Sequence, residues 1–128
     1  MDEKISAFIE QMELFGHDTG MPRSFARVIG FLLVCEPARQ SAKDIQEALS
    51  LSTGAVSNTL AALRASGMVR PVSTPGVRSM LYEMDSTGWK RNAARRIKAS
   101  TRALEIAEQG LQLQPDLHAA AARHRRAG

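Results

Sequence analysis

The sequence predicts a mainly α fold with a small β-hairpin wing, that is, a winged helix-turn-helix. Two short helical patterns occupy residues 41–49 and 52–66, close enough to be joined by a tight turn. Two strand patterns, residues 68–73 and 77–84, follow around a Pro-Gly turn and predict a hairpin. Further helical patterns flank this unit on both sides, and we expect them to mediate dimerisation.

The N-terminal part of the chain predicts two helices. The first, from Asp2 to about Phe15, is amphipathic, and we expect residues 16–20 to break it. The second begins at Met21-Pro22, with proline in its first turn, and ends at Cys35 before Glu36-Pro37. Because it is apolar around much of its circumference, it should form the centre of the core.

The two short helices carry the clearest functional pattern. Ser41 and Asp44 resemble a capping box at the start of the first helix. Gly67, which follows the second helix, suits the left-handed position just after a helix end. On the second helix, an inward stripe at helical spacing lies opposite an outward face that has neither charge nor bulk. The inward residues are Val56, Leu60 and Leu63, with Ala55 and Thr59 on the flank; the outward residues are Gly54, Ser57, Asn58 and Ala61. Such a face suits insertion into a DNA major groove. The alternative is an Ala/Ser-rich helix packed on both sides inside a bundle.

The hairpin adds a basic wing. Pro71 cannot donate a ladder hydrogen bond, so its strand should lie at the edge of the sheet. Arg78 lies beside the hairpin tip, where an arginine can reach a narrow minor groove. The alternative for Arg78 is a solvated charge at the hairpin edge.

A long helix is expected after the wing, from about Thr87 towards Gln112. Its apolar side is longer than a small winged-helix body can cover, because 25 residues of helix span roughly 37 Å. The simplest solution is a two-fold homodimer through the first and last helices, which would place two recognition helices about one DNA turn apart. We therefore expect one domain over residues 1–112 and a basic Ala/Arg-rich tail, frayed or disordered, over residues 113–128. The apolar side of the expected long helix consists of Trp89, Ala93, Ile97, Leu104, Ala107 and Leu111.

Charge is unevenly distributed along the chain, whose formal net charge is +4. Residues 1–50 contain five Lys or Arg against eight acids, whereas residues 51–104 contain nine against two. The positive charge therefore falls on the recognition element, the wing and the following helix, as expected of a phosphate-binding surface. For Lys90 to Lys98, a solvated helix face explains the charge equally well.

Several classes of function are not expected. The three histidines lie far apart with no metal-ligand spacing, and no phosphate loop, dinucleotide fingerprint or nucleophile elbow occurs, so we expect no metal, no cofactor and no catalysis. The acidic N-terminus does not resemble a signal peptide, and the longest apolar run, residues 29–35, is too short to cross a membrane. A soluble cytoplasmic protein, associated with the nucleoid when bound to DNA, is expected.

Two possible sensing features are less clear. Cys35 could respond to oxidants, but it ends the most apolar segment, which favours inert packing. A small-molecule effector could bind between the dimer helices and the winged-helix body, although core packing is the commoner role for such residues. The candidates for this pocket are Phe8, Met12, Phe15, Arg23, Phe25 and Trp89.

Four segments resemble the GbsR-like branch of the MarR-type transcriptional regulators. They are residues 21–37, residues 40–45, residues 52–58, and the wing residues 75–78 followed by Tyr82. The resemblance covers roughly residues 5–110. It implies a prokaryotic, dimeric winged-helix repressor or activator, often responsive to a small molecule. It also implies that Ser52, Thr53, Ser57 and Asn58 contact DNA and that Arg78 is the wing arginine, although the acidic residue that precedes this arginine in many relatives is absent.

The leading hypothesis is sequence-specific binding of double-stranded DNA by a homodimer that regulates transcription. Phosphate contacts are expected from Arg64, Arg70, Lys90 and Arg91, and base contacts from the uncharged face. The alternative is a winged-helix module for protein–protein contact that has lost DNA binding. The expected DNA-binding residues are Ser52, Thr53, Gly54, Ser57, Asn58, Arg64, Arg70 and Arg78.

Overall fold

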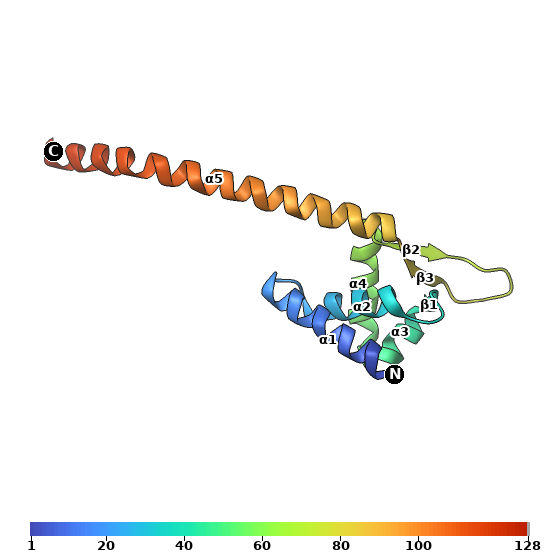
Figure 1. Cartoon of the computed structure of the whole chain (residues 1–128). Helices are drawn as coiled ribbons and strands as arrows, with labels where there is room; N and C mark the ends of the chain where they lie inside the picture. The colour runs from blue at the N-terminus through green and yellow to red at the C-terminus, as the bar shows by residue number, and fades with distance from the viewer. Residues whose placement is uncertain (128) are drawn as a thin grey trace. The chain divides into compact units, whose positions relative to one another are not determined.

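The computed structural model describes residues 1–127 and confirms the mainly α fold with a hairpin wing. The chain divides into two compact units, residues 1–90 and the residues from Arg91 onwards. The first unit contains four helices, a small sheet and the first turn of the last helix (Figure 1). The elements are α1 (Glu3–Asp18), α2 (Arg23–Val34), β1 (Gln40–Ser41), α3 (Ala42–Leu49), α4 (Thr53–Ala65), β2 (Val69–Val72), β3 (Leu81–Met84) and α5 (Ser86–Ala127).

Helix α1 begins with Asp2 as its N-cap, whose carboxylate accepts a hydrogen bond from the Lys4 amide at 2.7 Å. Helix α1 ends within the predicted break at residues 16–20, but it continues to Asp18, past the expected end at about Phe15 and through Gly16. Gly16 is buried, and a Cβ atom there would lie 2.9 Å from the Ala26 Cβ. The glycine therefore lets α1 pack closely on α2, instead of ending the helix.

The helix-turn-helix forms as the caps predicted. The Ser41 hydroxyl accepts a hydrogen bond from the Asp44 amide, and the Asp44 carboxylate accepts one from the Ser41 amide, both at 3.0 Å. Ser50 ends α3 in the left-handed region at φ 52°, and Ser52 caps α4. Gly67 has φ +76° after α4, which confirms its expected left-handed conformation.

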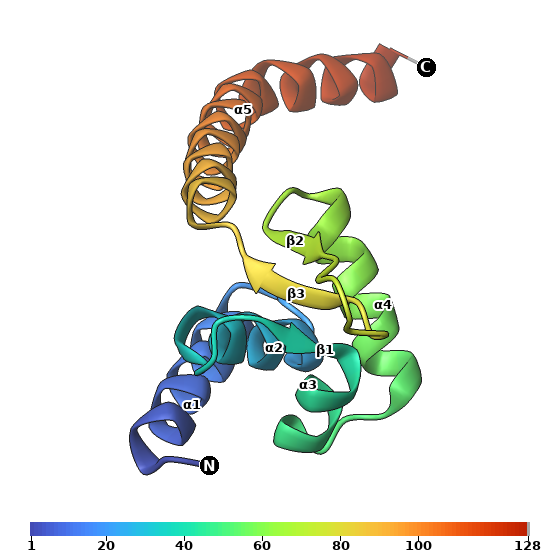
Figure 2. The same cartoon turned by 90° about the vertical axis from the view of Figure 1, so that its right-hand side faces the viewer.

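The three strands form one antiparallel sheet in the order β1-β3-β2 (Figure 2). The prediction that the strand with Pro71 is an edge strand is confirmed, because β2 pairs only with β3 in this sheet. Strand β3 begins at Leu81, later than the expected residue 77, so residues 73–80 form a long wing loop. The two-residue strand β1 was not predicted.

The core of the first unit lies around α2, as its apolar composition predicted. Val28 and Ile29 of α2 are fully buried, as are Ile45 and Leu49 of α3 and Leu63 of α4. Burying such side chains contributes about 1.5–3 kcal/mol each, so this cluster is the main source of stability for the unit. It packs α3 and α4 against each other and against α2.

Helix α5 is longer than predicted. It runs to Ala127, past the expected end near Gln112 and through Pro115. Proline removes one backbone donor, but residues 119–122 are four alanines, the residue with the highest helix propensity, and they sustain the helix beyond it. In the described part of the chain, none of the helices combines the length and apolar composition needed to cross a bilayer.

Candidate nucleic-acid interface

Helix α4 separates a buried face from an exposed one. Val56, Leu60 and Leu63 are buried, as the helical spacing predicted. Thr59 was expected on the flank but is only 1% exposed, because it faces the core together with them. The opposite face consists of residues that are all exposed: Thr53, Gly54, Ser57, Asn58, Ala61 and Arg64.

The N-terminal end of α4 is fixed by two local hydrogen bonds. The Ser52 hydroxyl accepts from the Ala55 amide at 3.1 Å and so satisfies one of the free donors of the first turn. The Gln46 side-chain amide of α3 donates to the Thr53 hydroxyl at 2.9 Å, across the turn. Ser52 and Thr53 therefore have structural roles in addition to their predicted contacts with DNA.

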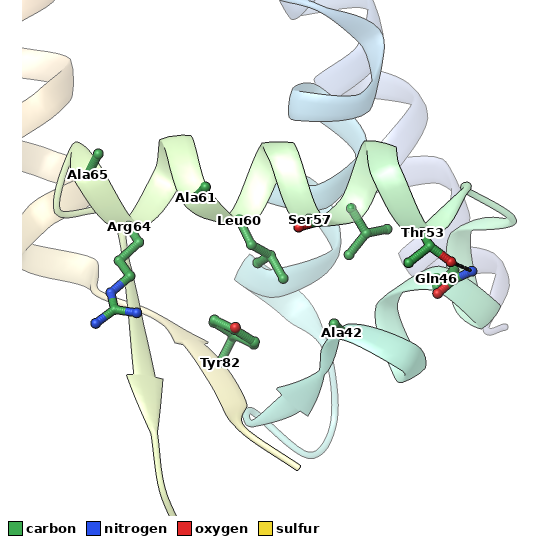
Figure 3. Close-up of a pocket in the computed structure, with 10 residues that line it drawn as sticks. Ala42, Gln46, Thr53, Ser57, Leu60, Ala61, Arg64, Ala65 and Tyr82 are labelled. Atoms are coloured by element: carbon green, nitrogen blue, oxygen red, sulfur yellow. Dashed lines mark hydrogen bonds between the residues drawn. The ribbon is translucent and has the colours of Figure 1, made fainter.

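A concave surface of about 700 Å³ lies between α4, the start of α3 and β3 (Figure 3). Three of the predicted site residues, Thr53, Ser57 and Arg64, contribute to its lining. Tyr82 of β3 also lines it, and sequence reasoning did not include this residue in the site. Alternation along the expected strand 77–84 puts Tyr82 on the same face as Arg78, and this signal could have identified Tyr82.

The wing loop presents an exposed cation. The Val77 amide donates to the Thr74 carbonyl at 3.0 Å, and Gly76 has φ +81°, which together make the expected turn. Arg78 follows this turn and is exposed. Within residues 1–127, no ion pair joins Arg64 or Arg78 to an acidic side chain.

Arg70, by contrast, has an acidic partner in the sheet. Arg70 of β2 and Glu83 of β3 are directly opposite in the antiparallel register, and their side chains lie 3.1 Å apart. Glu83 also pairs with Arg39 at 3.3 Å. The Arg70 charge is partly neutralised in the free protein, so a phosphate would compete with Glu83 for it. Sequence reasoning missed this pairing because it depends on the strand register.

The six residues proposed for an effector pocket do not all have similar surroundings. Met12 is buried in the core, and Phe8, Phe25 and Trp89 pack against it. Phe15 is 50% exposed, and Arg23 pairs with Glu13 at 3.1 Å. Arg23 also lines an open groove of about 490 Å³ at the α1–α2 junction, with Glu10, Glu13, Leu14, His17 and Met21. For four of the six, the core contacts support the alternative of plain packing.

Cys35 lies in the core, as expected for an inert thiol. Its sulfur is 3.5 Å from the Ala38 carbonyl oxygen, and burial raises the pKa of the thiol above its ordinary value. The thiolate needed for oxidation is therefore disfavoured. Among residues 1–127, no three His, Cys, Asp or Glu side chains are grouped so as to hold a metal ion.

The sequence matches no protein-family model. The HTH-type transcriptional regulator MmpR5 of Mycobacterium tuberculosis (strain ATCC 25618 / H37Rv) is 29% identical over 108 residues, which cover 84% of this chain and 66% of MmpR5. The chain thus spans just under two thirds of the length of this relative. It is similar in sequence to a helix-turn-helix regulator of transcription.

Solved structures share the fold. The crystal structure of a transcriptional regulator has a TM-score of 0.66 and 28% identity, covering 88% of this chain and 77% of the other. A mutant of Staphylococcus aureus MepR bound to an oligodeoxyribonucleotide has a TM-score of 0.53 and 17% identity, covering 93% and 91%. The chain therefore shares the fold of these solved structures, in which a helix-turn-helix is followed by a hairpin wing.

Proposed function

We propose that this protein is a sequence-specific, double-stranded DNA-binding transcriptional regulator that acts as a homodimer in the cytoplasm. The observation that carries the proposal is the exposed N-terminal part of the outer face of α4, which is uncharged and is followed by exposed arginines near the end of α4 and in the wing. Ser57 and Asn58 lie on that face, and Arg64 and Arg78 lack acidic partners within the described residues. Similarity to MmpR5 supports a role in transcription.

The residues divide into two roles by their chemistry. Arg64 and Arg78 carry full charges suited to phosphate oxygens or to a narrow minor groove. Asn58 has an amide that can donate to and accept from the edge of adenine. Gly54 and Ala61 have small side chains or none, which lets the backbone of α4 come close to the base edges.

Dimerisation is supported by the apolar residues of α5. Ile97, Leu104 and Leu111 fall on one side of the helix and are 69%, 60% and 66% exposed. Covering them with a second copy would bury apolar surface and bring two α4 helices to one DNA molecule. Membership of the GbsR-like branch and a response to a small-molecule effector remain part of the proposal, with the groove beside Arg23 as the place to seek an effector.

The first experiment is selection of bound duplexes from a randomised pool by the full chain, followed by sequencing. Enrichment of a two-fold-symmetric motif with half-sites about one turn apart is expected. Binding to that motif should weaken by orders of magnitude between 50 and 200 mM salt, as for several phosphate contacts. Lack of any enriched motif would contradict the proposal and favour the protein-contact module.

The residue-level prediction concerns Asn58. Asn58→Ala should cost about 1–3 kcal/mol in binding and relax the preference at one base pair per half-site. Asn92→Ala, the other asparagine of the chain, is the matched control and should leave the motif unchanged. A motif that is unchanged by Asn58→Ala would remove this residue from the base-reading set.

A further inference from the structure

A row of basic residues follows one side of α5 beyond its first turns. Arg91, Arg95, Lys98 and Arg102 are separated by four, three and four residues, which places them on the same face of a helix. All four are exposed. At 1.5 Å per residue, the row is about 16 Å long.

The row of positive charges destabilises the helix on which it lies. Like charges four residues apart repel, and no acidic residue occurs between Asp85 and Glu105 to offset them. Among the described residues, Arg102 is the member of the row with an acidic partner, Glu105, at 3.2 Å.

A second basic group on the same helix has a structural explanation. Arg123, Arg125 and Arg126 lie at the C-terminal end of α5, where the dipole favours positive charge. Helix stability therefore accounts for this C-terminal group, whereas it opposes the row that starts at Arg91. This contrast indicates that the row binds an anion outside the chain.

Association through the apolar side of α5 would leave the row accessible. At 100° per residue, Arg95 lies nearly opposite Ile97 and Leu104 around the helix, Arg91 lies about 120–140° from them, and Lys98 about 100–120° from them. A second copy that covered the apolar side would leave Arg91 and Arg95 away from the contact and Lys98 at its margin. The row also begins only seven residues after the last residue of β3, so along the chain it directly follows the wing.

We propose that the row from Arg91 to Arg102 binds the phosphate backbone of duplex DNA outside the base pairs that α4 reads. The proposal rests on the proposed function for the DNA partner, but it concerns a different surface. Duplex DNA presents a regular array of anions, which suits cations repeated along a helix. Such contacts would add affinity without adding sequence preference.

The test compares two charge-matched triple variants of the full chain. The first replaces the row with Arg91→Gln, Arg95→Gln and Lys98→Gln, and the second carries Arg123→Gln, Arg125→Gln and Arg126→Gln. Each is titrated with the selected motif alone and with the same motif extended by flanking duplex, over a range of salt concentrations. Circular dichroism and solution mass verify that both variants keep their helix content and oligomeric state.

The row variant should lose the affinity gained from the flanks, and the slope of log affinity against log salt should fall by up to about 2.7 per protomer. The C-terminal variant should behave as the unmodified chain, and both should select the same motif. Equal slopes for the two triple variants would overturn the proposal. So would a loss of dimer mass in the row variant, or binding to vesicles containing phosphatidylserine that depends on the row while duplex binding does not.

The two proposals fail in different ways. If the unmodified chain selects no motif, the proposed function fails, and random-sequence duplexes of two lengths replace the motif in the comparison. If the row variant then shows a smaller salt slope than the unmodified chain, DNA-backbone binding by the row is supported although the proposed function has failed. A selected motif with no dependence on the row would leave the proposed function intact and remove the further inference.

Discussion

The two units of the chain differ in where their apolar residues lie. In residues 1–90, apolar side chains from α1, α2, α3, α4 and β2 form one buried cluster. From Arg91 onwards, the large apolar side chains within the described residues are exposed, and Leu104 and Leu117 are 60% and 64% exposed. The first unit therefore has a core of its own, whereas the second unit consists of a helix whose apolar side needs a partner.

Because of this difference, α2 and α5 are stabilised in different ways. Both α2 and α5 carry apolar residues at helical spacing. Helix α2 is stabilised by tertiary packing, since Val28 and Ile29 are fully buried. Helix α5 beyond Arg91 lacks such packing within the described residues, so it depends on local propensity and, under the proposed dimerisation, on a second copy. Substitutions of the same type should therefore differ in effect between the units.

The largest difference is expected for one leucine in each unit. Leu63→Ala should destabilise the chain by about 2–5 kcal/mol, because the side chain is fully buried and its loss leaves a cavity. Leu104→Ala should change the stability of the monomer by less than about 0.5 kcal/mol but weaken self-association. Urea unfolding monitored by Trp89 fluorescence and sedimentation at several concentrations measure the two effects. Equal losses of stability would contradict the division into two units.

The next effect concerns the start of α5. Gly88 is buried, and a Cβ atom there would overlap the Gly67 carbonyl group after α4. Because the obstacle is backbone, Gly88→Ala should force a shift and cost about 1–3 kcal/mol. Thermal unfolding measures this loss. Gly54→Ala is the control, since a Cβ atom there meets nothing within 4 Å. A neutral Gly88→Ala would show that the two backbones can separate at little cost.

A smaller effect is expected at the start of α3. Ser41→Ala removes the hydroxyl that accepts from the Asp44 amide, which is one half of the reciprocal pair, and should destabilise the first unit by about 1 kcal/mol. Chemical denaturation provides the measurement. Ser100→Ala replaces an exposed serine inside α5 and should be within about 0.5 kcal/mol of neutral. If both changes were neutral, the capping box would contribute nothing.

The smallest effect is a pH dependence from Cys35. Burial holds the pKa of this thiol above its ordinary value, so the folded state keeps its proton where the unfolded state loses it. Stability should therefore fall as pH rises above about 8.5, the pKa of a free cysteine, and Cys35→Ala should remove this part of the decline. Unfolding midpoints between pH 7 and pH 10 measure it. An identical decline in both proteins would assign it to other groups.

Local signals predicted most of the fold. The capping box at Ser41, the left-handed Gly67 and the edge position of Pro71 each follow from the chemistry of one or two neighbouring residues, and the structure confirms all three. The inward stripe on α4 was also correct for Val56, Leu60 and Leu63. These features depend on backbone preferences and helical periodicity, which a single sequence contains.

Features that depend on distant partners could not be predicted in this way. Strand β1 has two residues, too few for a pattern, and it exists because β3 pairs with it. The burial of Thr59 and the pairing of Arg70 with Glu83 depend on which elements pack together. Within the candidate site, sequence chemistry selected the exposed face of α4 but not Tyr82, and the roles of these residues in DNA binding remain predictions.

The position of β3 at the centre of the sheet also constrains the order in which the chain can fold. The hairpin of β2 and β3 joins residues close in sequence, whereas β1 and β3 join Gln40 to Tyr82 and Ser41 to Leu81. Closing that long loop before α3 and α4 have formed would carry a large entropic cost. We expect the sheet to close last, so that during synthesis β1 stays unpaired until β3 has emerged from the ribosome.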